Sequence, residues 1–326
     1  MACYCLCLTC LGSLPARAQI TFTASELPAV AGDYVDEYVS ANTDPSAMIG
    51  TTGGPQIWDF SQAPQSADIV RRMAIVLTTD GGQQASFPKA SYAEYYTDDT
   101  GTQERDYYNI SNSFGRYYFG SYIPNEVTNT FSPPAIDIPA IAGYGTNWSY
   151  VFSTSYGGIT ETDTVSAAVD AYGTVLLPQL GSFPALRVNQ LTTNVEYLPF
   201  VGPSATNYIR EYYWLVPGFD KAVHIVSQQD STPPPAKFTS AVEVRRVFAT
   251  NYVMNVPSPV GSLRINLLKG KALLNWLVES NASAYQVQAV GDLAMTNWLI
   301  LASPATNFWS EPLTSTQRFY RVFVEP

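Results

Sequence analysis

Apolar and polar residues alternate with a period of two along most of the chain, a pattern typical of β-strands. In residues 206–218 (TNYIREYYWLVPG) large side chains fall on both alternating faces, and the run ends at Pro217 and Gly218. This segment predicts a central strand. The same alternation, bounded by Gly, Pro, Asn or Asp, recurs in residues 145–155, 162–173, 185–198, 222–229 and 240–253.

No segment keeps a helical period, and 23 Pro and 21 Gly separate the short apolar runs. We therefore predict an all-β fold of antiparallel β-sandwich domains rather than a parallel sheet. The Pro-rich segment 255–262 predicts a linker between a region at 19–256 and a C-terminal module at 259–326. That module, of about 65 residues, predicts a small fibronectin-III or immunoglobulin-like sandwich, shorter than the about 100 residues of a full one. Residues 131–145 are either a second domain boundary or a crossover within one domain.

The first residues predict a secretory signal peptide at 1–18. The chain's four cysteines are Cys3, Cys5, Cys7 and Cys10, in an apolar run before Ala16 and Ala18. These two small residues fit the positions that a signal peptidase reads, with cleavage before Gln19. The alternative is a thiolate metal site in the mature protein.

The net charge of −10 disfavours two classes of partner. An acidic surface repels nucleic-acid phosphates and anionic lipid. After the leader, no apolar stretch approaches the roughly 20 residues of a membrane-spanning helix. We expect no nucleic-acid partner, no transmembrane segment, and a secreted or outer-cell-surface location.

Several blocks resemble secreted β-rich proteins of unknown function from Bacteroidota-like and Verrucomicrobiota-like bacteria. They include Trp58, Asp59, Phe60 and Ser61 near the start, and the segment 169–188 (VDAYGTVLLPQLGSFPALRV). The tail, with Trp276, Tyr285, Trp298, Phe319, Tyr320 and Arg321, is similar to a terminal surface or sorting-type module of such proteins. The resemblance implies an exported, surface-associated protein and implies no reaction.

Carboxylates are the main candidates for catalysis, because the single histidine, His224, excludes two-histidine metal motifs. His224 lies in a predicted strand interior, which favours a structural role. The segment 95–108 contains Asp98, Asp99, Glu104 and Asp106 around Gly101, so Asp99 and Glu104 are candidates for a catalytic pair across a hairpin. The alternative is a solvated hairpin tip. Asp98, Asp99 and Asp106 are a candidate calcium site, and we predict no other cofactor.

Neighbouring tyrosines occupy opposite faces of several predicted strands. The chain has 22 Tyr, and the candidate glycan-binding rings are Tyr95, Tyr96, Tyr107, Tyr108, Tyr117 and Tyr118. The alternative is a cross-strand aromatic ladder that stabilises the sheet without a ligand.

These observations predict an exported or cell-surface, non-catalytic protein that binds glycans or mediates adhesion, with polysaccharide or cell-surface components as partners. Two alternatives remain. One is a carbohydrate-active hydrolase with paired carboxylates, and the other is a structural surface-layer component.

Overall fold

The computed structural model describes residues 20–125 and 128–252, and then 258–259, 263–268, 270–276, 284–291, 298–312 and 318–325. The predicted signal peptide with its four cysteines, and most of the predicted linker at 255–262, lie outside the described residues. The chain divides into two compact units, the first at 20–254 and the second from 255 onward.

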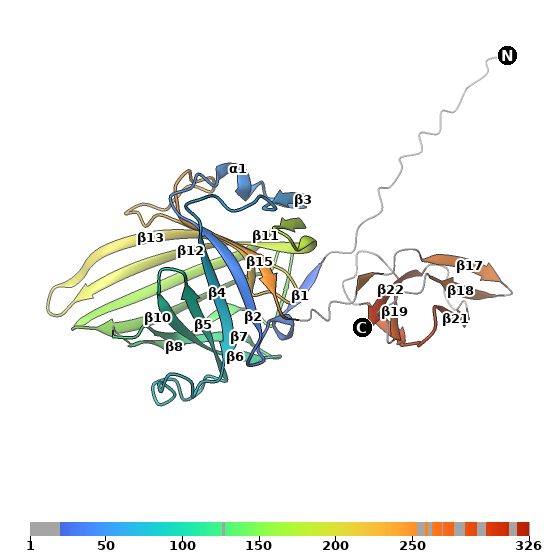
Figure 1. Cartoon of the computed structure of the whole chain (residues 1–326), viewed down its shortest axis with the longest axis horizontal. Coiled ribbons are helices and arrows are strands. Elements are labelled where there is room, and N and C mark those ends of the chain that lie inside the picture. Colours follow the sequence, from blue (N-terminus) through green and yellow to red (C-terminus); the bar gives the residue numbers. More distant parts are fainter. Residues whose placement is uncertain are drawn as a thin grey trace, which may run out of the picture. The chain divides into compact units, whose positions relative to one another are not determined.

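The first unit is a closed barrel of twelve antiparallel strands (Figure 1). Closure occurs because β10 pairs with β8 on one side and with β11 on the other. In order around the barrel the strands are β10 (Asn147–Tyr156), β8 (Thr128–Ile138), β7 (Gly115–Tyr122), β6 (Gln103–Ser111), β5 (Tyr92–Asp98), β4 (Ile69–Val76), β2 (Tyr34–Ser40), β15 (Ala241–Thr250), β14 (Lys221–Ser227), β13 (Gly202–Leu215), β12 (Gly181–Leu198) and β11 (Ile159–Leu177).

The prediction of an all-β, antiparallel fold is confirmed, but the first unit forms a barrel where a sandwich was expected. Both folds show the same period of two, and only the pairing of β10 with both β8 and β11, which closes the ring, separates them. The segment 131–145 contributes most of β8 and the short β9 (Ile141–Gly143) to this unit.

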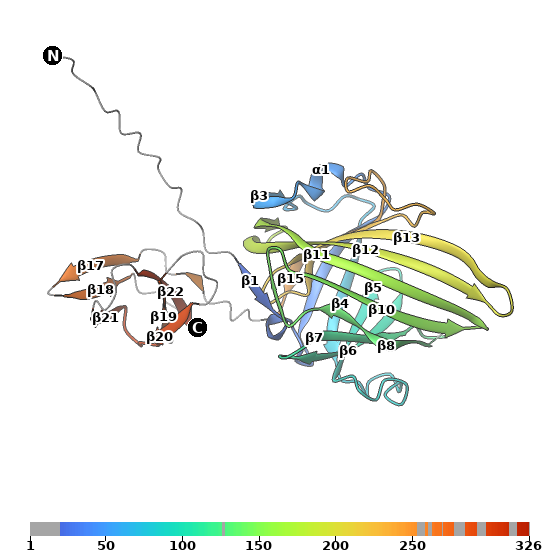
Figure 2. The same ribbon diagram turned by 180° about the vertical axis from the view of Figure 1, so that it is seen from behind.

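One outer face of the barrel is covered by the segment that contains α1 (Ser46–Ile49) and β3 (Gly53–Asp59), seen from both sides in Figures 1 and 2. β3 pairs in parallel with the last part of β11. Gly173 makes this pairing feasible, since a Cβ there would lie 2.0 Å from the Gln56 carbonyl oxygen. Trp58 and Phe60 pack edge-on against Trp214, with ring centroids 5.7 and 5.0 Å away. This outer core fixes β3 to the barrel wall.

The N-terminal segment packs into the barrel interior. It comprises β1 (Thr21–Thr23), which pairs with β9, and the 3-10 helix η1 (Ala24–Glu26). Phe22 and Ala24 are fully buried in one apolar cluster with Val188, Tyr213 and Leu215. Part of the space inside the barrel is therefore filled by this segment rather than by strand side chains.

The second unit contains two small antiparallel sheets. Their orders are β16-β22-β19-β20 and β17-β18-β21. The strands are β16 (Ser258–Pro259), β17 (Arg264–Leu268), β18 (Lys271–Asn275), β19 (Ala284–Val290), β20 (Leu299–Ala302), β21 (Phe308–Pro312) and β22 (Phe319–Glu325). Leu274 of β18 and Trp276, the residue after that strand ends, share one apolar cluster with Tyr285, Val287 and Val322. Assignment of this unit to the fibronectin-III or immunoglobulin type stays a prediction.

Within the described part of the chain, no helix has the length and apolarity needed to cross a membrane.

Candidate functional site

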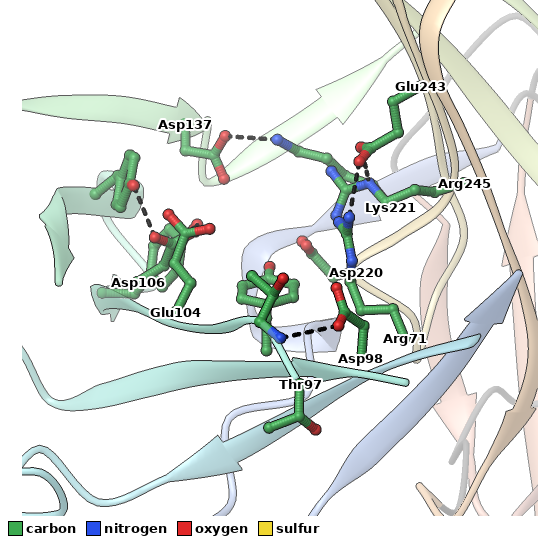
Figure 3. Close-up of a pocket in the computed structure, with 14 residues that line it drawn as sticks. Arg71, Thr97, Asp98, Glu104, Asp106, Asp137, Asp220, Lys221, Glu243 and Arg245 are labelled. Atoms are coloured by element: carbon green, nitrogen blue, oxygen red, sulfur yellow. Dashed lines mark hydrogen bonds and ion pairs between the residues drawn. The ribbon is translucent and has the colours of Figure 1, made fainter. Parts of the chain in front are cut away.

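A cavity of about 350 Å³ lies inside the barrel of the first unit (Figure 3). Tyr118 from β7 and Lys221 from β14 both line it. These two strands stand on opposite sides of the twelve-strand ring, so only the enclosed interior can bring their side chains to one space. The remaining lining residues are Arg71, Tyr96, Thr97, Asp98, Thr102, Glu104, Asp106, Tyr108, Asp137, Asp220, Glu243 and Arg245.

Strand β6 supplies the acidic side of the cavity. Glu104, Asp106 and Tyr108 alternate along it, so all three point to the same face. The Tyr118 hydroxyl donates a hydrogen bond of 2.8 Å to Asp106, and the Tyr108 hydroxyl reaches the same carboxylate at 3.5 Å. Burial, followed by the charge of Glu104, raises the pKa of Asp106 to about 7. Asp106 therefore exchanges its proton near neutral pH.

Basic side chains face Asp106 from the other walls. Glu243 lies between two guanidinium groups, 2.9 Å from Arg71 and 2.7 Å from Arg245. Burial acts to raise the pKa of Glu243, but the charges of Arg245 and Arg71 outweigh it and lower that pKa. The Lys221 ammonium contacts Asp137 at 3.1 Å. This ion pair joins β14 to β8 across the barrel interior.

Arg116 is fully buried and contacts three carboxylates of this network. Its guanidinium lies 2.8 Å from Glu94 and 2.6 Å from Asp220, and it also contacts Asp137. One guanidinium cannot balance three carboxylates. Burial, followed by the charge of Asp220, raises the pKa of Glu94 to about 8. Glu94 is therefore largely protonated at neutral pH, so the guanidinium of Arg116 is left with the carboxylates of Asp220 and Asp137.

His224 belongs to a neighbouring buried network rather than to the cavity wall. Its Nε2 lies 2.7 Å from Glu211, and Arg245 contacts its Nδ1. A guanidinium can only donate, so Nδ1 accepts and Nε2–H donates to Glu211. Burial, followed by the charge of Arg245, lowers the pKa of His224. The imidazole is therefore neutral and positioned as a structural group.

The structure separates the six candidate tyrosines by face. Tyr96, Tyr108 and Tyr118 line the cavity, and Tyr95, Tyr107 and Tyr117 alternate with them onto the outer face. Outside the barrel, the Tyr95 ring lies under Arg105, with the guanidinium carbon 4.2 Å from its centroid. Tyr107 is fully buried and stacks on Phe87 at 4.0 Å. Each of these two outer rings already has a partner within the chain.

The candidate carboxylates are separated in the same way. Glu104 and Asp98 line the cavity, but Asp99 is exposed at the hairpin tip, where it accepts a 3.4 Å hydrogen bond from the Val70 amide. The expected pair of Asp99 and Glu104 is therefore not brought together. The reason is parity, because the cross-strand partner of Glu104 is Tyr96 and Asp99 lies an odd number of residues further on.

The candidate calcium site has only two of its three carboxylates at the cavity. Asp98 and Asp106 line it, and Asp99 does not. Asp98 also accepts hydrogen bonds from the amides of Thr100 and Thr102 in the turn. Among the described residues, no group of three or more His, Cys, Asp or Glu side chains is placed to hold a metal ion.

Several residues of the site carried no individual signal in the sequence. Arg71, Asp137, Lys221, Glu243 and Arg245 line the cavity together with the residues of β5 and β6. The sequence does contain one indication that they face the interior. Charged residues occupy strand positions between apolar ones, as in residues 241–247 (AVEVRRV). Their partners come from distant strands, which periodicity does not identify.

No protein-family model, no curated protein and no solved structure matches this chain.

Proposed function

We propose that this chain is an exported or cell-surface, non-catalytic protein that binds a glycan inside its barrel. The proposal depends mainly on one observation, that Tyr96, Tyr108 and Tyr118 share a single cavity with Glu104 and Asp106. Carboxylates and phenolic hydroxyls suit the hydroxyl groups of a sugar, and the flat faces of aromatic rings suit its apolar C–H faces. A concave site that combines aromatic walls with a few convergent polar groups is the usual form of a small-ligand site.

The size of the cavity agrees with this proposal. About 350 Å³ is at the lower end of the roughly 300–1,000 Å³ typical of small-molecule sites. The carboxylates also argue for a neutral or cationic sugar, since an acidic one would meet Glu104 and Asp106 directly.

The export part of the proposal rests on the leader-like first 18 residues and on the family resemblance described above. In this proposal the second unit serves attachment or display on the cell surface, and polysaccharide or cell-surface components are the partners. An adhesive role is the same binding activity directed at a neighbouring cell or matrix.

A hydrolase is the second candidate, and a specific observation favours it. Glu104 and Asp106 lie two residues apart on one face of β6, and the pKa of Asp106 is raised to about 7. A protonated acid beside a second carboxylate is the arrangement used in glycoside hydrolysis. In that case the acid is Asp106 and its partner is Glu104, in place of Asp99.

The test is to incubate the full chain with a panel of soluble and insoluble polysaccharides and to measure both protein depletion and release of reducing ends. We expect depletion without release. Asp106→Asn should weaken binding by about tenfold or more, the usual range for a lost hydrogen bond to a charged group. Asp99→Asn is the matched control, because Asp99 belongs to the same hairpin but lies outside the cavity, and it should bind like the wild type.

The other outcomes separate the alternatives. Release of reducing ends that Asp106→Asn abolishes would replace the binding proposal with the hydrolase. No depletion by any polysaccharide, together with self-association of the chain, would favour a structural surface component.

A further inference from the structure

A row of aromatic rings leads from the cavity along the inner wall of the barrel. Five adjacent strands each supply one ring, in the order Tyr92 of β5, Tyr108 of β6, Tyr118 of β7, Phe131 of β8 and Phe152 of β10. Successive ring centroids are 5.7, 4.9, 4.8 and 4.3 Å apart. Because each ring contacts the next, all five lie on the face that Tyr108 and Tyr118 present to the cavity.

Burial changes along this row. Tyr92 and Tyr108 are 4% and 5% exposed, whereas Tyr118, Phe131 and Phe152 are only half-buried. Tyr92, Tyr108 and Tyr118 also belong to or pack against the main apolar core. Phe131 and Phe152 lie outside every described hydrophobic cluster. The row therefore starts inside the core and ends as accessible aromatic surface.

A purely structural ladder does not account for the accessible end of the row. Rings that stabilise a sheet gain most when their neighbours bury them, and Phe131 and Phe152 keep part of their surface open. Polar groups also stand beside them, because Asp163 is the cross-strand neighbour of Phe152 and accepts a 3.0 Å hydrogen bond from Asn194. An aromatic ring next to a carboxylate repeats the combination found in the cavity.

We propose that Phe131 and Phe152 extend the cavity into a longer site, so that the ligand is an oligosaccharide chain rather than a single sugar. This inference rests on the proposed glycan binding. One end of the chain occupies the space beside Asp106, and the following units lie against Phe131 and Phe152. The length of the chain, and not only the chemistry of one unit, then determines affinity.

The test is a chain-length series on the full protein by isothermal titration calorimetry. The probes are cello-oligosaccharides and chito-oligosaccharides from the monomer to the hexamer. We expect affinity to rise by roughly five- to tenfold once the chain is long enough to contact a further ring. Phe152→Leu keeps apolar volume but removes the flat ring, so it should abolish this rise and leave the affinity for the monomer unchanged.

The matched control is Tyr95→Leu, which removes a ring from the outer face of β5 and should leave the affinity for every length unchanged. Unchanged binding of the monomer by Phe152→Leu also reports an intact fold, which separates the binding role from a structural one. Equal affinity for all lengths, or an equal loss at all lengths in Phe152→Leu, would overturn the extended site while the glycan-binding proposal stands. If no member of either series binds, both proposals are overturned.

Discussion

Replacing Arg116 by Met would test whether the charged network inside the barrel is as buried as the structure indicates. Arg116 has 0% of its side chain exposed, and its contacts to Glu94 and Asp220 are 2.8 and 2.6 Å long. Without the guanidinium, Asp220 and Asp137 would face each other, with Lys221 as the remaining cation on Asp137. Removing one partner of a buried ion pair costs about 3–5 kcal/mol, because it leaves uncompensated buried charge.

The lower end of that range applies here. Glu94 already favours its protonated form, with a pKa of about 8, so it adds little new charge when Arg116 is lost. We therefore expect the free energy of unfolding to fall by about 3 kcal/mol, out of the about 5–15 kcal/mol typical of a domain. This corresponds to a drop of about 10 °C in the melting temperature of the barrel.

The assay is urea unfolding of the full chain followed by tryptophan fluorescence, with thermal unfolding as a second measurement. Arg72→Met is the matched control, since Arg72 pairs with Asp36 at 2.6 Å but its side chain is 49% exposed. An exposed ion pair contributes about 0–1 kcal/mol. If Arg116→Met loses no more stability than Arg72→Met, the network is hydrated in solution and Arg116 is not held in a buried ion pair.

Further predictions concern the protonation of Asp106, Glu211 and His224. In the folded barrel Asp106 has a pKa of about 7, above its value in the unfolded chain, so its contribution to stability is lost as the pH rises towards 7. Glu211 has a folded pKa of about 2, below its unfolded value, so its contribution is lost as the pH falls from about 4 towards 2. Urea midpoints should therefore be higher at pH 5 than at pH 8, and Asp106→Asn should reduce that difference; equal midpoints for the wild type would refute this. His224, the only histidine, should stay neutral with its proton on Nε2 when the NMR signals of its ring are followed through its ordinary pKa of 6.5; an ordinary titration there would exclude the contact from Arg245.

The alternation of residues predicted more of the site than the individual chemical assignments did. Placing neighbouring tyrosines on opposite faces required only the period of two, and the structure has Tyr96, Tyr108 and Tyr118 on one face. Pairing Glu104 with Tyr96 rather than with Asp99 takes a further step, from the face of a strand to the partner across the hairpin. That step needs the register of β5 against β6, which depends on the turn around Gly101 and is not set by composition.

Barrel closure could not be predicted from local pattern. β10 and β11 are joined by the tight turn at Gly157 and Gly158, and such a hairpin is common to sandwiches and barrels. What closes the ring is the pairing of β10 with β8, which the register records at a single pair, Ser153 with Ser132. The ion pair of Lys221 with Asp137, from β14 and β8, likewise joins residues that are distant in sequence. A sequence pattern indicates which face of a strand a residue occupies, but not which residue of another strand it contacts.

The width of the barrel explains why one set of residues serves both stability and the proposed binding. Eight strands enclose a space that side chains just fill, so twelve strands leave more room than aliphatic residues can occupy. Here the N-terminal segment fills part of that room, and long charged and aromatic side chains such as Arg116 and Tyr108 fill another part. The cavity is what remains, and its walls are the same groups.

This double role makes Asp106 the most informative position in the chain. At pH 8 its buried charge beside Glu104 destabilises the folded barrel, so Asp106→Asn should raise the urea midpoint there. In the binding proposal the same change removes a charged acceptor from the ligand site and lowers affinity. A residue with a purely structural role would change stability alone, so a variant that is more stable at pH 8 and yet binds glycan more weakly would identify Asp106 as part of the site.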